Sequence, residues 1–240
     1  DYYCYIHPFM TGKVYVQGPG IGERDTQESL DGRGAADYRS QIAELKAAAA
    51  AAAAKPVAVS AKAGGGKKYT LMVSSAGDVK VGDVMQFFPP TLNIRINDEV
   101  EFVSNVHTPH DVAFAPAGFN PAGPPPPEAA NWNPFASGLN YAAGAKIDGS
   151  RMVASPIIGL GFPSGAKASF SFPKAGTYNY FCAPHASQGM AGSIVVSSGA
   201  PGAPNTGGSL AITERSGTSG LIVIWGAVTI TMAATAAAIY

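Results

Sequence analysis

Alternating apolar and polar positions mark the strands that this chain is expected to form. The runs at 99–103, 176–181 and 192–196 are rich in aromatic and β-branched residues, as β-strands are. A similar run at 69–74 follows three glycines and predicts the first strand of the same unit. The pattern therefore predicts an all-β domain.

A different pattern precedes this domain. From about Ala35 to Lys55 the chain is rich in alanine and includes eight consecutive alanines, the residue with the highest helix propensity. We expect a helix of roughly 20 residues, about 30 Å long, that ends at Pro56. We interpret it as a semi-rigid spacer, and a regulatory or partner-binding helix is the alternative.

The last 20 residues carry no charge and are predominantly apolar. At about 1.5 Å per residue, residues 221–240 would extend about 30 Å, the hydrocarbon thickness of a bilayer. Because the stretch lacks the polar periodicity of a buried amphipathic helix, it predicts a transmembrane anchor. No basic residue follows Tyr240, although a cytoplasmic flank normally carries Lys or Arg, so we expect the natural chain to continue.

A long insertion interrupts the predicted domain between Ala115 and Gly165, and it is rich in Pro, Asn and Gly. A loop of this length is more often functional or mobile than part of a sandwich core. Trp132, Phe135 and Tyr141 either form a face for a partner or anchor the loop, and we favour anchoring.

The composition limits the classes of function. The 240 residues include 16 acidic and 16 basic side chains, which leaves no polybasic surface for nucleic acid. Only 13% of the residues are charged, and the 29 glycines and 19 prolines fit a loop-rich β protein with a membrane-linked tail.

Four residues point to metal chemistry. Cys182, His185 and Met190 follow a C-x2-H-x4-M pattern on the loop between the last two predicted strands, and His110 follows an earlier strand. Two imidazoles, one thiolate and a weak axial thioether are the ligand set of a blue-copper electron-transfer centre. Taken singly, His110 would be an ordinary loop histidine and Met190 a core residue, and Gln188 is the rival axial ligand.

The sequence from about Met85 to Val196 resembles the cupredoxin family, particularly its plastocyanin and halocyanin branch. The resemblance rests on these ligand motifs and on an entry segment, residues 87–102, that is similar to the family pattern F-x-P-x4-V-x2-G-D-x-V-x-F. It implies a Greek-key β-sandwich of about eight strands. It also implies one type 1 copper held by His110, Cys182, His185 and Met190.

Two positions depart from the family pattern. Relatives usually have Asn after the first histidine and often a hydroxyl residue after the cysteine, whereas this chain has Asp111 and Ala183. The departure removes the basis for expecting the usual hydrogen bond between the two ligand loops. Such bonds help to set the potential of a metal site.

The ligand motif recurs in shortened form at the start of the chain. Cys4, His7 and Met10 follow a C-x2-H-x2-M pattern that resembles the amicyanin branch, and residues 2–16 align with 180–196 as an internal repeat. Sixteen residues cannot bury a core. We therefore expect the remnant of a first cupredoxin domain with a partial copper site. A disulfide between Cys4 and Cys182 is the less favoured alternative, because each lies in a ligand motif.

These observations predict five segments along the chain. They are the domain remnant (1–17), a linker with the Ala-rich helix (18–65), the complete cupredoxin domain (66–198), a flexible linker (199–219) and the transmembrane anchor (220–240). Copper thiolates suit an oxidising compartment, so we expect the domain at the plasma membrane on its extracytoplasmic face, periplasmic or external.

The expected function is to carry single electrons between redox protein partners, without a substrate and without nucleic acid. A multicopper oxidase or nitrite reductase would need several further histidines, and the chain has four in all, three of them in the copper motifs. Such an enzyme would need a second copper centre outside this sequence. The copper subunit of a terminal oxidase would need two cysteines in one loop. A copper-binding module without a redox role remains a further alternative.

Overall fold

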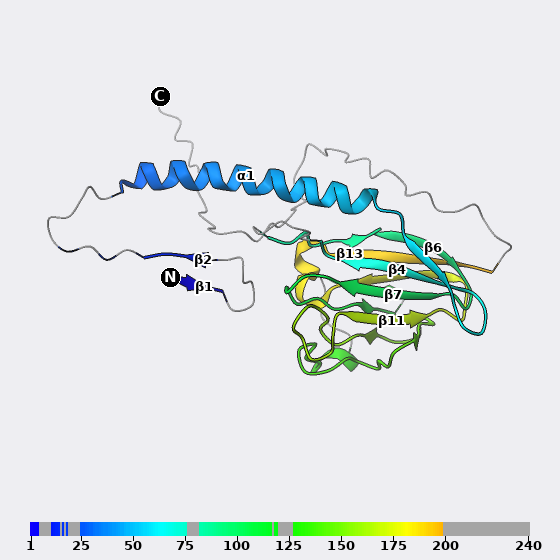
Figure 1. The fold of residues 1–240 in the computed structure, drawn as a ribbon. Coiled ribbons are helices and arrows are strands. Elements are labelled where there is room, and N and C mark those ends of the chain that lie inside the picture. The colour runs from blue at the N-terminus through cyan, green and yellow to red at the C-terminus, as the bar shows by residue number, and fades with distance from the viewer. Residues whose placement is uncertain are drawn as a thin grey trace, which may run out of the picture.

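A computed structural model of the chain describes residues 1–4, 11–14, 16, 18, 25–75, 82–116, 118–119 and 127–198. Most of the strands form two β-sheets that enclose one hydrophobic core, with a long helix along one side (Figure 1). The predicted all-β sandwich is confirmed. The two sheets place strands that are distant in sequence side by side, as where β13 (Ala191–Ser197) pairs with β6 (Thr91–Arg95) and β4 (Lys67–Val73) pairs with β7 (Glu99–Ser104).

One sheet has five strands in the order β10-β8-β12-β13-β6. Its strands are β6 (Thr91–Arg95), β8 (Ala113–Phe114), β10 (Val153–Ala154), β12 (Gly176–Phe181) and β13 (Ala191–Ser197). The pairing of β13 with β6 is parallel, and the other pairings are antiparallel. The runs expected at 176–181 and 192–196 form β12 and β13, which are adjacent strands in the interior of this sheet.

The other sheet has six strands, five of them in the order β3-β4-β7-β11-β9, and β5 pairs with β4. Its strands are β3 (Ala58–Ala61), β4 (Lys67–Val73), β5 (Phe87–Phe88), β7 (Glu99–Ser104), β9 (Ala145–Lys146) and β11 (Lys167–Ser171). Strand β3 was not expected. It pairs antiparallel with β4, so the sheet extends upstream of residue 66.

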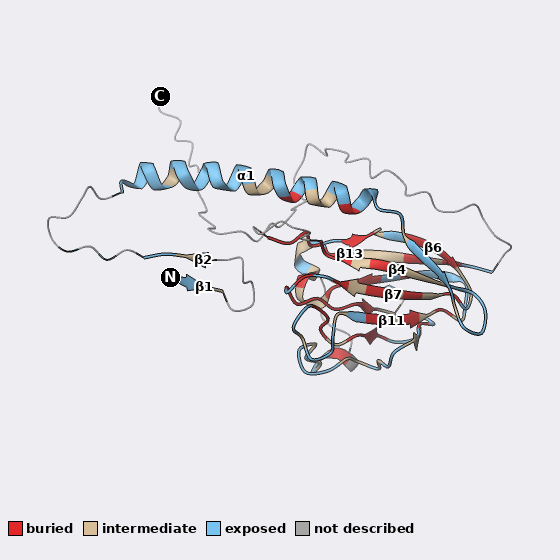
Figure 2. Ribbon diagram, in the orientation of Figure 1, coloured by how far each residue is buried: buried red, intermediate tan, exposed pale blue. Residues whose placement is uncertain are grey.

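Alternation along the strands fills the space between the sheets. In β7 the side chains of Val100 and Phe102 are fully buried, whereas Glu99 and Glu101 lie on the outer face. The ring of Phe102 makes edge-on contacts with Phe87, Phe114, Phe170 and Tyr180 at centroid distances of 5.0–6.2 Å. Such pairs contribute roughly 0.5–1.5 kcal/mol each beyond the burial of their area. Figure 2 shows the buried positions concentrated in the sheets.

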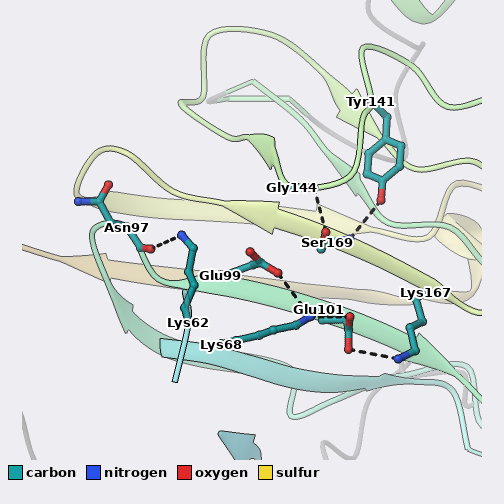
Figure 3. A network of polar contacts seen from close by, with 9 residues as sticks. All are labelled: Lys62, Lys68, Asn97, Glu99, Glu101, Tyr141, Gly144, Lys167 and Ser169. Carbon is teal, nitrogen blue, oxygen red and sulfur yellow. Dashed lines mark hydrogen bonds and ion pairs between the residues drawn. The ribbon is translucent and has the colours of Figure 1, made fainter. Parts of the chain in front are cut away.

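The outer face of the second sheet carries ion pairs (Figure 3). Lys68 Nζ lies 2.7 Å from Glu101 Oε1 and 3.5 Å from Glu99 Oε1, and Lys167 Nζ lies 3.7 Å from Glu101 Oε2. These side chains are partly exposed, and such pairs contribute only about 0–1 kcal/mol each. The aromatic contacts inside the sandwich therefore stabilise it more than these surface ion pairs do.

The helix α1 runs from Gln27 to Ala54 and starts well before Ala35, the expected start. Thr26 caps it, since its side chain accepts a hydrogen bond from the Ser29 N–H. The start of α1 was not predicted because its first turns are charged, contain two glycines and have no stripe of apolar residues along one face. The C-terminal half packs on the sandwich, where Leu45 and Ala52 are buried in a cluster with Val84 and Phe88.

The insertion forms part of the sandwich. It contributes the edge strands β9 and β10 and a short 3₁₀ helix, η1 (Pro127–Ala129). Trp132 donates from Nε1 to the Ser137 carbonyl, and the Tyr141 hydroxyl accepts from the Ser169 N–H (Figure 3). Trp132 also packs against the buried cluster that contains Ala113 of β8 and Phe181 of β12, so both aromatic side chains anchor the insertion, as expected. Phe135 is 57% exposed.

Two short strands near the N-terminus, β1 (Tyr2–Tyr3) and β2 (Thr11–Gly12), form a separate two-stranded sheet. The predicted anchor at 221–240 lies outside the described residues. Of the helices within the described ranges, none has the length and apolar character needed to span a bilayer.

Candidate metal centre

The loop between β12 and β13 carries three of the predicted ligands. Phe181 and Ala191 are paired at its base, and the Cys182 N–H donates to the Met190 carbonyl at 3.0 Å. The chain between them forms a short 3₁₀ helix, η2 (Ala183–Gln188), which ends at Gly189 with φ of 80°. Glycine adopts this left-handed conformation without strain, so the loop can turn back towards β13.

The fourth residue, His110, reaches the same end of the sandwich from between β7 and β8. Its N–H donates to the Ile158 carbonyl at 3.2 Å, and the Ile158 N–H donates to the His110 carbonyl at 2.6 Å. Ile158 belongs to the insertion, which therefore fixes the backbone of the first histidine. The sequence alone gave no signal for this pairing, because isolated bridges have no pattern of their own.

The two histidines and the cysteine converge on one point. The Cys182 Sγ atom lies 3.7 Å from His110 Nδ1 and 3.3 Å from His185 Nδ1. One ligand atom from each of these three residues lies within 4.8 Å of the other two. His110 and Cys182 are 0% exposed and His185 is 6% exposed, so the group is closed to bulk water.

Met190 is also 0% exposed, and its N–H donates to the His185 carbonyl at 3.3 Å. Its rival Gln188 is only partly buried, and Gln188 Oε1 accepts a hydrogen bond from the Ser187 hydroxyl at 2.9 Å. Met190 is therefore the more deeply buried of the two candidate axial residues. His107, two residues before Pro109, is exposed, and its Nδ1 lies 3.0 Å from the Leu160 carbonyl oxygen.

Asp111 links the two ligand segments. The Ala183 N–H donates a hydrogen bond of 2.6 Å to Asp111 Oδ1, although no bond between these loops was expected from the residues at positions 111 and 183. The donor is a backbone group, so the loss of a side-chain hydroxyl at position 183 does not prevent the contact. On the other side, the Val112 N–H donates to Ser155 Oγ at 3.0 Å and ties this segment to the insertion.

Burial dominates the electrostatics of the centre. It raises the pKa of the Cys182 thiol well above its usual value, and the neighbouring Asp111 carboxylate raises it further. Burial also raises the pKa of Asp111 to about 7, against the opposing effect of the Ala183 N–H. A thiol that ligates a metal ion is deprotonated outright. Metal uptake therefore has to release the Cys182 proton.

The donor set fits copper. Two imidazole nitrogens and one sulfur surround a common point, and a buried thioether lies in the same loop. Soft sulfur suits cuprous copper and imidazole suits the cupric ion, so this mixture matches a blue-copper site better than a zinc or magnesium site.

The N-terminal motif is only partly visible. Cys4 is half-buried and does not form a disulfide with Cys182, whereas His7 and Met10 lie outside the described residues. The strand register nevertheless matches that of the complete site. Tyr3 pairs with Thr11 on either side of the short motif, as Phe181 pairs with Ala191 on either side of the long one.

Solved structures of two copper proteins are similar to this chain. Amicyanin from Paracoccus versutus is 21% identical with a TM-score of 0.31, and the match covers 47% of this chain and 74% of that one. A mutant plastocyanin of fern is 22% identical with a TM-score of 0.32, covering 53% of this chain and 99% of that one.

Sequence comparison identifies the family. The family described as copper binding proteins, plastocyanin/azurin family, matches residues 73–197, more than half of the 240 residues. Chloroplastic plastocyanin from Chlamydomonas reinhardtii is 30% identical over 130 residues, covering 53% of this chain and 71% of that protein. The corresponding protein from Tetradesmus obliquus is 27% identical over 130 residues, covering 51% and 68%. The chain therefore belongs to the plastocyanin/azurin family of copper-binding proteins, and its sandwich is a cupredoxin domain with copper as its cofactor.

Proposed function

We propose that this protein carries single electrons between redox protein partners through one type 1 copper, with His110, Cys182, His185 and Met190 as ligands. The observation that carries the proposal is the convergence of the first three side chains within 4.8 Å, in a chain that belongs to a copper-binding family. When bound, copper accepts and returns one electron.

Burial of the centre supports a carrier over an enzyme. A catalytic metal site keeps a coordination position open for substrate or water. Here Cys182, His110 and Met190 are 0% exposed, and the most accessible of the four, His185, is 6% exposed. A bound substrate would have to displace packed side chains, whereas an electron can pass through the His185 ring without any such movement.

The chain contributes a fixed set of donors. The His110 backbone is paired with Ile158, the Cys182 N–H is bonded to the Met190 carbonyl, and Asp111 joins the two segments. Ligands held in this way do not have to rearrange when the charge of the metal changes. Such a site suits both oxidation states, which is the requirement of a fast carrier.

We propose a location as well. The uncharged residues 221–240 would anchor the protein in the plasma membrane, with the copper domain on the extracytoplasmic face. The length and composition of that segment support the anchor, and the copper thiolate supports an oxidising compartment.

The N-terminal motif supports a second proposal. We propose that residues 1–17 are the last part of a first cupredoxin domain, and that Cys4, His7 and Met10 are three ligands of its copper site. The matching registers of β1–β2 and β12–β13 around the two motifs support this relationship. Three ligands on a segment too short to bury a core of its own should bind copper only weakly.

Voltammetry of the copper-loaded protein tests the carrier function. The proposal requires one reversible one-electron wave for each tightly bound copper and no catalytic current when dioxygen or nitrite is added. A catalytic current would indicate an enzyme, and the lack of any reversible wave would indicate a binding module without a redox role.

A further inference from the structure

Gly192 lies where two other groups leave no room for a side chain. A Cβ atom at this position would be 2.5 Å from Tyr180 Oη, 2.6 Å from Tyr180 Cζ and 2.6 Å from the Pro90 carbonyl oxygen. Tyr180 and Gly192 are direct partners across β12 and β13. The tyrosine ring therefore covers a bare glycine on the neighbouring strand, an arrangement known from aromatic side chains that shield glycines in paired strands.

Neither of the two groups can easily move away. The Tyr180 ring is held by Phe87, Phe102 and Phe114 at centroid distances of 4.8, 5.0 and 5.2 Å. The Pro90 carbonyl accepts a hydrogen bond of 2.8 Å from the Ser193 N–H. Any added side chain at Gly192 would therefore displace β13 itself, since packed cores resist such expansion.

This displacement would act directly on the ligand loop. Tyr180 lies two residues before Cys182, and Gly192 lies two residues after Met190. The backbone hydrogen bond from Cys182 to Met190 closes the loop two pairs further along the same ladder, beyond the Phe181–Ala191 pair. The separation of the strands at Tyr180 and Gly192 thus determines how close the cysteine and the methionine lie.

The same contact occurs in the N-terminal hairpin. Tyr2 and Gly12 are paired partners, and a Cβ atom at Gly12 would be 2.4 Å from Tyr2 Cζ and 2.5 Å from Tyr2 Oη. The two motifs differ in loop length, C-x2-H-x2-M against C-x2-H-x4-M, but keep this contact at the same position. The contact is therefore a property of the base of the loop and does not depend on the loop's length.

We propose that the ring of Tyr180 over Gly192 is a positioning contact, which sets the distance between the strands that carry Cys182 and Met190. The inference rests on the proposed assignment of these two residues as copper ligands. The ring itself does the positioning. The Tyr180 hydroxyl is buried and has no hydrogen-bond partner among the residues that the structure describes.

Paired variants at position 180 test the proposal. Tyr180→Phe keeps the ring and should leave the absorption spectrum and the rate of copper loss to a chelator unchanged. Tyr180→Leu removes the ring, and it should alter the ratio of the copper absorption bands and speed copper loss at least about tenfold, as loss of support for metal ligands does. Phe170→Leu is the matched control, because Phe170 is as deeply buried as Tyr180 (0% and 1% exposed) but lies in β11. It should lower the melting temperature without changing the spectrum.

A second pair of variants adds a methyl group at a glycine, once at Gly192 and once at a control position. Gly192→Ala should change the spectrum and the copper-loss rate in the same direction as Tyr180→Leu. Gly66→Ala is its control, since Gly66 has a φ of 89° and a Cβ there would be 3.1 Å from Asp98 Oδ1 and 3.2 Å from the Asn97 carbonyl oxygen, at the start of β7 and so at the end of that strand opposite His110. It should reduce stability alone.

The proposal is overturned if Tyr180→Leu gives the same spectrum and copper-loss rate as Tyr180→Phe. It is also overturned if Phe170→Leu changes the spectrum as strongly as Tyr180→Leu, since the effect would then be general loss of packing. Both of these outcomes compare variants of a protein that binds copper, so they test the positioning contact and not the ligand assignment. A parent protein that lacks a blue copper band would instead refute the ligand assignment.

Discussion

Ala183 and Asp111 join the two halves of the copper centre, since the Ala183 N–H donates a hydrogen bond of 2.6 Å to Asp111 Oδ1. Asp111 directly follows His110, and Ala183 directly follows Cys182. The bond therefore fixes the separation of two residues that are 72 positions apart in the sequence. Both partners lie beside proposed ligands, so the bond should hold the centre in shape before copper binds.

Removing this acceptor should weaken copper binding. Asp111→Ala leaves the Ala183 N–H without its partner, and we expect copper affinity to fall by roughly 10–100-fold, the usual effect of losing support for a metal ligand. Asp111→Asn keeps an oxygen acceptor of the same shape and should stay close to the parent. Competition with a chelator of known affinity measures both. Equal losses in the two variants would show that the hydrogen bond is not responsible.

The ligand residues were predictable from the sequence because their chemistry and spacing are specific. Cys182, His185 and Met190 share one loop, and strong alternation marked the strands on either side of it. The bond between Asp111 and Ala183 was not predictable, since its donor is a backbone group that every residue except proline has.

The strands and helical turns that were not predicted from the sequence have no clear pattern of apolar and polar residues. Strand β3 is four residues long and all of them are exposed, so it has no alternation and depends on its pairing with β4. Strands β9 and β10 have two residues each and exist only as partners of longer strands. The first turns of α1 are polar and contain glycine, and only the cap at Thr26 marks its start. Pairing with neighbouring strands therefore determines β3, β9 and β10 more than propensity does.

The axial position should affect potential more than occupancy. We predict that Met190→Gln still binds copper but lowers the reduction potential, because a harder oxygen ligand favours the cupric state. Gln188→Ala is the control and should leave the potential unchanged, because Gln188 Oε1 is bonded to Ser187. Voltammetry gives both values. If the midpoint moves with Gln188→Ala and stays fixed with Met190→Gln, the axial ligand is the glutamine.

The C-terminal segment should hold the protein in a membrane. We predict that the full chain stays in the membrane fraction of an expressing cell after a carbonate wash, because about 20 apolar residues match a bilayer. A chain that ends at Ser198 should be soluble and keep its copper, since all four proposed ligands precede that residue. Release of the full chain by the wash would mean that residues 221–240 do not span the bilayer.

Copper stoichiometry should separate the complete site from the partial one. After dialysis against a chelator we expect close to one copper for each chain of this sequence, because Cys4, His7 and Met10 are only three ligands and residues 1–17 are too few to bury a core that would hold them. Cys4→Ser should leave this value unchanged. Metal analysis provides the number. A value near two in the parent that falls to one in Cys4→Ser would show that the N-terminal motif assembles a tight site, either alone or with a second chain.

The absorption spectrum of the copper-loaded protein before and after Cys182→Ser tests the central claim most directly. The Cys182 sulfur lies 3.3 Å and 3.7 Å from the two histidine nitrogens, so the thiolate should be the ligand that gives a blue-copper centre its intense visible band. We expect the parent protein to be blue and Cys182→Ser to lack the band, whereas Cys4→Ser should remain blue. A band of parental intensity in Cys182→Ser would contradict the assignment of this site.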